Sequence, residues 1–145
     1  MDRVLLMTYQ EIVEKLLADT GASRTTIRLD RPDAVFPVVA EATAPGINSI
    51  AGATSIDLKA APTYIFLAEE KRPLIQSDLL DTDVPAPPAL IELYGARAQM
   101  LAPILRNDDL VGILSVHYAP GVREWTSEDI AALEQAAEHV QAQLD

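Results

Sequence analysis

The chain has 145 residues, and its 22 acidic against 11 basic side chains give a formal net charge of −11 at pH 7. A surface with this charge repels phosphates, so nucleic acid is not expected as a partner. The sequence contains no cysteine and only two histidines, which excludes disulfides, thiolate nucleophiles and cysteine-ligated metals and leaves too few ligands for a histidine-rich metal site.

The first half of the chain predicts one helix followed by two strands. Apolar residues recur at intervals of three and four over residues 3–18, the spacing of an amphipathic helix, and Gly21 is suited to the left-handed position after its C-terminus. Alternating and β-branched residues over 24–29 and 34–42 predict two antiparallel strands. Proline, glycine, asparagine and serine over residues 44–53 indicate irregular structure.

The second half adds short elements and a pair of strands before the last helix. In chain order these are a helix over residues 57–71, a short strand over 74–77, a short helix over 88–94, and two strands over 98–105 and 110–118. Pro62 disfavours the first turns of the helix over 57–71, because proline lacks the amide hydrogen that a helix interior needs. The Asn-Asp-Asp sequence at 107–109 is suited to a hairpin turn between the last two strands.

A final helix is predicted over residues 127–144. Thr126 can accept a hydrogen bond from the Asp129 amide while the Asp129 carboxylate reaches back, which makes a capping box. Five apolar residues follow in steps of three and four, namely Ile130, Leu133, Ala137, Val140 and Leu144. This heptad spacing predicts a homodimer built on the terminal helices. The alternative is that the same residues pack on the domain's own sheet.

The order of these elements and four local motifs resemble a GAF domain. The motifs are Arg72 to Asp78, Ala102 to Leu105, Asp108 to His117, and Glu124 to Asp129 followed by Leu133. The resemblance implies a single GAF domain over residues 1–145, of the α/β class (α+β type). Its antiparallel sheet of five to six strands would carry the N- and C-terminal helices on one face and a ligand pocket on the other. A PAS-like sensor, which has a similar sheet, is the alternative fold.

The resemblance also implies a set of ligand-binding residues. On the strand over 110–118, alternation would turn Leu114 toward the helices and Ser115 and His117 toward the pocket. The full set expected at the pocket is Arg28, Tyr64, Phe66, Gln99, Ser115 and His117. A buried arginine needs a counter-charge and the set contains no acid, so an anionic ligand such as a small carboxylate is expected. The alternatives are a surface ion pair for Arg28 and ordinary core packing for Tyr64 and Phe66.

Departures from known family members narrow the function. Free-methionine sulfoxide reductases and the phytochromes that attach a bilin use cysteines, which this sequence lacks. The Asn-Lys-Phe-Asp-Glu signature of the cyclic-nucleotide-binding members is also absent. Ser115 and His117 share one strand face with Cβ atoms about 7 Å apart, which is too far for a nucleophile and its base. We therefore predict no cofactor, no metal and no enzymatic activity.

The function predicted from the sequence is a non-catalytic sensory domain of a bacterial-type regulator. It would bind a small molecule, signal through its terminal helices and act on a protein partner. The alternatives are a dimerisation module without a ligand and an enzyme related to the cysteine-dependent reductases. No apolar run approaches the roughly 20 residues of a membrane span, and the N-terminus lacks the pattern of a signal peptide, so a cytoplasmic protein without a membrane partner is expected.

Overall fold

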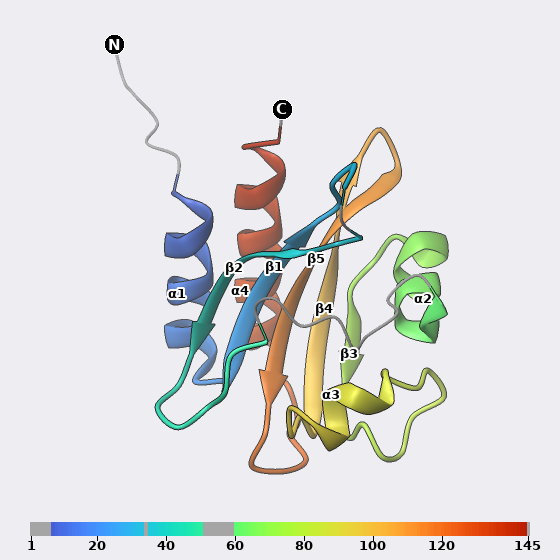
Figure 1. Ribbon diagram of the computed structural model, residues 1–145. Coiled ribbons are helices and arrows are strands. Elements are labelled where there is room, and N and C mark those ends of the chain that lie inside the picture. The colour runs from blue at the N-terminus through green and yellow to red at the C-terminus, as the bar shows by residue number, and fades with distance from the viewer. Residues whose placement is uncertain (1–6, 34, 51–59, 145) are drawn as a thin grey trace.

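The computed structural model describes residues 7–33, 35–50 and 60–144. Its helices are α1 (Tyr9–Thr20), α2 (Pro62–Glu70), α3 (Pro88–Glu92) and α4 (Ser127–Gln141), and its strands are β1 (Arg24–Leu29), β2 (Val38–Thr43), β3 (Leu74–Gln76), β4 (Ala98–Arg106) and β5 (Asp109–Tyr118). The strands form one antiparallel sheet in the order β2-β1-β5-β4-β3. Figure 1 shows α1 and α4 behind this sheet and α2 and α3 on the other side, toward β3 and β4. None of the described helices is both long and apolar enough to span a membrane.

The predicted order of helices and strands is confirmed, and boundaries shift where backbone geometry requires it. β2 begins at Val38 rather than at residue 34, because Phe36 adopts a positive φ of 45°, which a strand does not allow. α2 begins at Pro62, which occupies the first helical position, where its missing amide hydrogen is not needed. Residues 57–59 of this predicted helix lie outside the described residues, as do residues 3–6 of the first one.

Both terminal helices cover one face of the sheet and enclose the main core, as predicted. Three buried residues in each helix face the sheet, Ile12, Val13 and Leu16 in α1 and Leu133, Ala136 and Val140 in α4. They pack with side chains such as Leu114 and Val116 of β5, which alternation had turned toward the helices. The opposite face of the sheet is thereby left for α2, α3 and the site described below.

The apolar residues of α4 in heptad spacing are used inside the chain. Leu133 and Val140 are 0% exposed in the main core, and Ile130, Ala137 and Leu144 are partly buried against the same core. These residues had predicted a surface for a second copy, but they cover the domain's own sheet instead. The coiled-coil period and the ordinary helical period diverge by only about 20° per heptad, and α4 is about two heptads long. The spacing alone therefore does not distinguish packing against a second copy from packing on the domain's own sheet.

Gly112 of β5 leaves no room for a side chain beside the backbone of β1. A Cβ atom added at Gly112 would lie 2.6 Å from Leu29 Cδ2 and 2.7 Å from the Arg28 carbonyl oxygen. Both distances are shorter than van der Waals contact, and a backbone oxygen in a paired strand has little room to move. Glycine is therefore required here by close approach rather than by φ.

Gly112→Ala is expected to lower the free energy of unfolding by about 1–3 kcal/mol, because the added methyl group overpacks the β1–β5 interface. Urea denaturation followed by circular dichroism measures the change. Gly121→Ala is the matched control, since a Cβ at Gly121 meets nothing within 4 Å. Equal unfolding midpoints for the two variants would show that the sheet relaxes around the methyl group at no cost.

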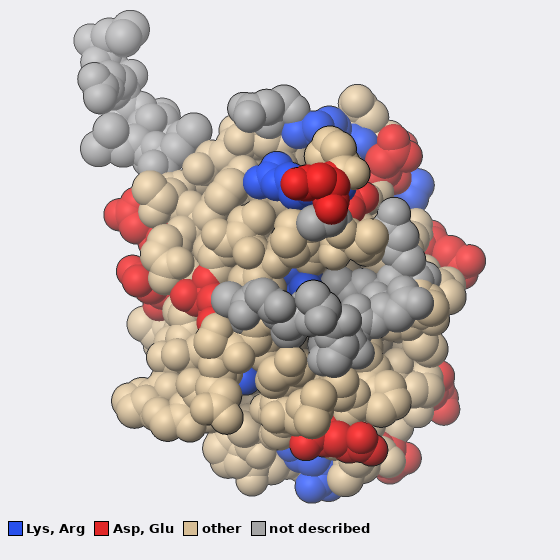
Figure 2. Space-filling model, viewed as in Figure 1, with Lys and Arg blue, Asp and Glu red and all other residues tan. Residues whose placement is uncertain are grey.

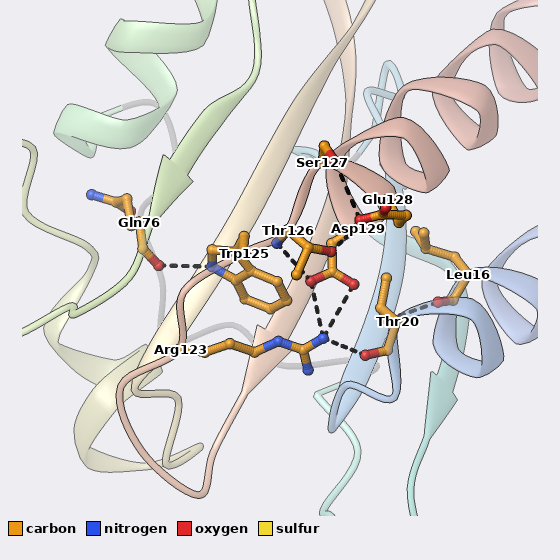
Figure 3. A network of polar contacts seen from close by, with 9 residues as sticks. All are labelled: Leu16, Thr20, Gln76, Arg123, Trp125, Thr126, Ser127, Glu128 and Asp129. Carbon is orange, nitrogen blue, oxygen red and sulfur yellow. Dashed lines mark hydrogen bonds and ion pairs between the residues drawn. The ribbon is translucent and has the colours of Figure 1, made fainter.

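A cluster of polar contacts fixes the beginning of α4 against α1 (Figure 3). The predicted capping box is confirmed, with the Asp129 amide donating to Thr126 Oγ1 at 3.1 Å and the Thr126 amide donating to the Asp129 carboxylate at 3.0 Å. Arg123 Nη2 donates to both carboxylate oxygens of Asp129 and to the carbonyl oxygen of Thr20. Because Thr20 is the last residue of α1, one guanidinium joins the end of α1 to the beginning of α4.

Trp125, just before α4, joins the same cluster to β3. Its Nε1 donates to the carbonyl oxygen of Gln76 at 3.0 Å, and its ring meets the Tyr118 ring edge-on with centroids 6.4 Å apart. The Arg123 guanidinium lies 4.4 Å from the Trp125 ring centroid, within the range of a cation–π contact. The beginning of α4 is therefore tied both to α1 and to β3, the edge strand next to β4.

Candidate functional site

A cavity lies on the face of the sheet opposite α1 and α4. Its described lining consists of Arg28, Ile50, Thr63, Pro87, Leu90, Gln99, Leu101, Ile113, Ser115 and His117. The cavity volume is about 40 Å³, enough for a few water molecules or one small organic molecule. Figure 2, which views this side of the molecule, shows mostly uncharged residues with scattered acidic and basic side chains.

The register of the strands places a row of polar side chains across this face. Gln76 of β3 pairs with Gln99 of β4, Gln99 pairs with His117 of β5, and His117 pairs with Arg24 of β1. The four residues, here called the polar row, are all buried. Buried polar groups are costly unless they are hydrogen-bonded. Four buried polar side chains in one row are therefore more than core packing requires, and they mark this part of the sheet as a candidate binding surface.

Arg28 is a buried cation without a carboxylate partner among the described residues. Its side chain is 8% exposed, and its Nη1 donates to the Phe36 carbonyl oxygen at 2.8 Å. Burial lowers the pKa of the Arg28 guanidinium, but arginine has so high a pKa that it stays charged in proteins. The Arg28 charge therefore lies at the cavity with a neutral carbonyl as its acceptor.

Arg24 adds a second buried guanidinium. Its Nη2 donates to the Asn48 carbonyl oxygen at 2.6 Å, and its Nε lies 3.7 Å from Glu41 Oε2 without forming a hydrogen bond. The Glu41 carboxylate also accepts a hydrogen bond from the Ile50 amide at 2.8 Å. Burial is the main cause that lowers the pKa of Arg24, while Glu41 acts in the opposite direction. Around the cavity, two guanidinium groups thus face one nearby carboxylate among the described residues.

His117 is neutral at physiological pH. Burial first, and then the positive charges of Arg24 and Arg28, lower the pKa of His117 to about 3. Its Nδ1 lies 3.3 Å from Arg24 Nη1. Because a guanidinium only donates, Nδ1 is the acceptor of this pair and the single proton of the imidazole is on Nε2. His117 therefore offers an N–H donor rather than a charge.

Half of the described lining is apolar, with Leu90, Leu101 and Ile113 among its walls. A cavity with few polar groups between apolar walls is typical of a site for a small organic ligand. In the described part of the chain, no three histidine or acidic side chains are close enough to hold a metal ion.

The structure brings together four of the six residues that the sequence predicted at the pocket. Arg28, Gln99, Ser115 and His117 all line the cavity. They come from β1, β4 and β5, where the resemblance to the family together with alternation along the strands had placed them.

Tyr64 and Phe66 lie elsewhere, in an apolar cluster beside the cavity. The Tyr64 ring meets the Phe36 ring edge-on with centroids 5.4 Å apart, and both Tyr64 and Phe66 pack against the buried residues of this cluster. In α2 it is Thr63 and Leu67 that are buried, and Thr63 lines the cavity. Successive helical residues point about 100° apart, so Tyr64 is turned away from Thr63 and the cavity, while Phe66, one helical turn after Thr63, packs against the apolar cluster. The expected roof of Tyr64 or Phe66 is thus replaced by Thr63.

Sequence reasoning missed Arg24, although a signal for it was present. Arg24, Thr26 and Arg28 alternate along β1 and so share the face that carries the cavity. The contribution of Thr63 had no comparable signal, because it depends on how α2 is rotated about its axis.

The comparisons with known proteins place this chain in a family. A family model described as GAF domain matches residues 5–144. The chain belongs to the GAF domain family. A search of curated proteins gave no match to this GAF domain.

Solved structures of photoreceptors share the fold of this GAF domain. The TePixJ GAF domain of a cyanobacteriochrome superposes with a TM-score of 0.78 at 17% identity, over 97% of this chain and 95% of that one. The chromophore-binding domain of Stigmatella aurantiaca phytochrome P1 gives 0.73 at 19% identity, over 99% of this chain and 55% of that one. GAF3 from Slr1393 of Synechocystis sp. PCC6803 gives 0.70 at 15% identity, over 92% and 88%. At these identities the likeness shows a common fold.

Proposed function

We propose that this GAF domain is a cytoplasmic, non-catalytic sensor that binds a small anionic molecule in the cavity and signals through α1 and α4. The observation that carries the proposal is the buried guanidinium of Arg28, which lines the cavity and donates to the neutral Phe36 carbonyl. A buried charge is costly unless an opposite charge compensates it. A carboxylate can accept two parallel hydrogen bonds from one guanidinium, so a small carboxylate is the natural complement.

The state of His117 supports a binding role over catalysis. A general base works best with a pKa near the operating pH, whereas the pKa of His117 is lowered to about 3. Its Nδ1 is also occupied by Arg24. The Ser115 hydroxyl therefore has no effective base in His117, and we propose that the pair contacts ligand without activating a nucleophile.

The solved structures that resemble this domain include chromophore-binding domains, and a bilin is the first ligand to consider. The chain has no cysteine for a thioether bond to a chromophore. A cavity of about 40 Å³ is also far smaller than a tetrapyrrole requires. Both observations favour a ligand of a few heavy atoms for this domain.

A chain of hydrogen bonds supports signalling from the cavity to the helices. Gln99, which lines the cavity, donates a hydrogen bond to the side-chain oxygen of Gln76 at 2.8 Å. The backbone carbonyl of the same Gln76 accepts a hydrogen bond from Trp125 Nε1 at 3.0 Å. Trp125 directly precedes the capping residue of α4, Thr126. We propose that a ligand with different affinity for two arrangements of this connection shifts the population of α4 positions, which a protein partner would recognise.

Wild-type protein is expected to bind acetate in preference to acetamide, which has the same shape and no charge. Arg28→Gln should abolish this preference, because it removes the guanidinium while keeping a hydrogen-bond donor. Isothermal titration with acetate and acetamide measures the preference. We expect Arg28→Gln to bind acetate at least tenfold more weakly than wild type, because a hydrogen bond to a charged group contributes roughly 1.5–3 kcal/mol.

Arg106→Gln is the control for this experiment, since Arg106 is exposed and lies away from the cavity lining. Arg28→Lys, which restores the charge without the fork of donors, should recover part of the acetate affinity. Undiminished acetate binding by Arg28→Gln, or equal binding of acetate and acetamide by the wild type, would contradict the anion site.

The homodimer predicted from the sequence is not part of this proposal. Leu133 and Val140 are buried in their own chain. The side of α4 away from the sheet carries Glu128, Glu134 and Glu138, whose charges would repel the same surface of a second copy. The alternative of a dimerisation module without a ligand therefore has less support than a sensor.

A further inference from the structure

The side-chain amides of Gln76 and Gln99 have an orientation that their partners determine. Gln76 Nε2 donates to the Val84 carbonyl oxygen at 2.7 Å and to Thr82 Oγ1 at 2.9 Å. Since a carbonyl oxygen can only accept, the nitrogen of Gln76 points to Val84, and its Oε1 accepts from Gln99 Nε2 at 2.8 Å. Gln99 Oε1 is the end of this chain of amides, and no described residue donates to it.

The neighbouring strand offers the opposite group. His117 lies directly across from Gln99 in the β4–β5 pair, and both residues line the cavity. Arg24 occupies the Nδ1 of His117, so the imidazole proton is on Nε2, for which no described residue is an acceptor. The cavity lining thus includes Gln99, whose Oε1 is a neutral acceptor, and His117 across the strand pair, whose Nε2 is a neutral donor, together with the Arg28 cation.

We propose that the ligand is a small hydroxycarboxylate, whose carboxylate pairs with Arg28 while its hydroxyl donates to Gln99 Oε1 and accepts from His117 Nε2. This inference rests on the proposed function, which supplies the anion site. A hydroxyl group is both a donor and an acceptor, so one group satisfies both residues. A ligand without a donor would leave Gln99 Oε1 unpaired in a closed site, which costs affinity.

The charges around the cavity select a hydroxyl over an ammonium group as the donor. The described lining contains Arg28 and no acid, and Arg24 lies behind His117. The nearby Glu41 carboxylate is already engaged by Arg24 and by the Ile50 amide. An amino acid would bring its ammonium group toward two guanidinium groups without a compensating carboxylate, so the site discriminates against amino acids.

Four small carboxylates test the inference on the wild-type protein: glycolate, acetate, methoxyacetate and glycine. Isothermal titration is expected to show glycolate binding about tenfold more tightly than acetate, because one buried hydrogen-bond pair is added. Methoxyacetate, which keeps the oxygen and loses the donor, should fall to the level of acetate or below, and glycine should bind most weakly. Lactate against propionate and alanine repeats the comparison with one more methyl group.

The variant Gln99→Leu tests whether Gln99 causes the preference for glycolate over acetate. The variant should bind glycolate and acetate equally, because it removes the acceptor for the hydroxyl and leaves Arg28 in place. Gln135→Leu, the same substitution at an exposed position of α4, should keep the preference for glycolate. If Gln99→Leu does not fold, as judged by circular dichroism, the four-probe series on the wild type decides alone.

The outcomes separate this inference from the function on which it rests. Carboxylates that bind through Arg28 with no preference for glycolate over acetate or methoxyacetate would overturn the hydroxycarboxylate and leave the anion sensor intact. A glycolate preference that persists in Gln99→Leu would also overturn it. No binding of any carboxylate would overturn both.

Discussion

Val140→Glu is expected to unfold the domain rather than to change its association state. Val140 is 0% exposed and packs in the main core between α4 and the sheet. An unpaired carboxylate at such a position costs several kcal/mol, and the whole stability of a domain is only about 5–15 kcal/mol. The variant should lose its cooperative thermal transition in circular dichroism and its near-ultraviolet signal from Trp125.

Gln135→Glu is the matched control, since it adds the same charge to the exposed side of α4. Its free energy of unfolding should stay within about 0.5 kcal/mol of wild type. A folded Val140→Glu protein whose sedimentation shows half the mass of the wild type would contradict the packing of Val140 and restore the dimer predicted from the heptad spacing.

Acidification is expected to destabilise the protein through His117. In the folded state the pKa of His117 is lowered from 6.5 to about 3, so between these values the unfolded chain binds a proton that the folded chain does not. The free energy of unfolding therefore has its full value above pH 6.5 and falls as the pH drops toward 3. The total loss from this one residue is roughly 5 kcal/mol. Urea denaturation at several pH values between 7 and 4 measures the larger part of this loss.

The variant His117→Asn isolates this effect from that of the carboxylates. An asparagine oxygen can replace Nδ1 as the acceptor for Arg24, and asparagine does not titrate. The variant should therefore lose less stability than the wild type over the same decrease in pH. His139→Asn, in the last turn of α4 and away from the cavity lining, should follow the wild-type curve. If the free energy of unfolding decreases equally with pH in wild type and His117→Asn, protonation of His117 does not destabilise the folded state.

Most of the fold was predictable because local chemistry and tertiary structure agree. The capping box of Thr126 and Asp129 fixed the beginning of α4, and the alternation in β1 and β5 fixed which side chains face the helices. The heptad spacing of α4 did not indicate where its apolar residues pack, and the homodimer stays a prediction. An apolar stripe shows that a helix packs on something, and only the three-dimensional arrangement shows that Leu133 meets the domain's own sheet.

The site was predictable where it depends on strands and not where it depends on helix rotation. Ser115 and His117 reached the cavity because the period of a strand leaves two faces to choose from. A helix as short as α2 leaves many rotations open, so the choice between Thr63 and Tyr64 could not be made from spacing. The orientation of the Gln99 amide depends on Val84, through a hydrogen-bond chain that no local pattern indicates.

The antiparallel arrangement of α1 and α4 has a consequence for protein engineering. α1 begins and α4 ends at the same end of the molecule, whereas the cavity lies on the far face of the sheet (Figure 1). A domain whose two ends lie together can be inserted into a surface loop of a host enzyme without stretching the loop. Both junctions would then touch the host, and the cavity would lie on the face of the sheet opposite the two helices. Such an insertion would place the catalytic activity of the host under the control of whatever occupies this cavity.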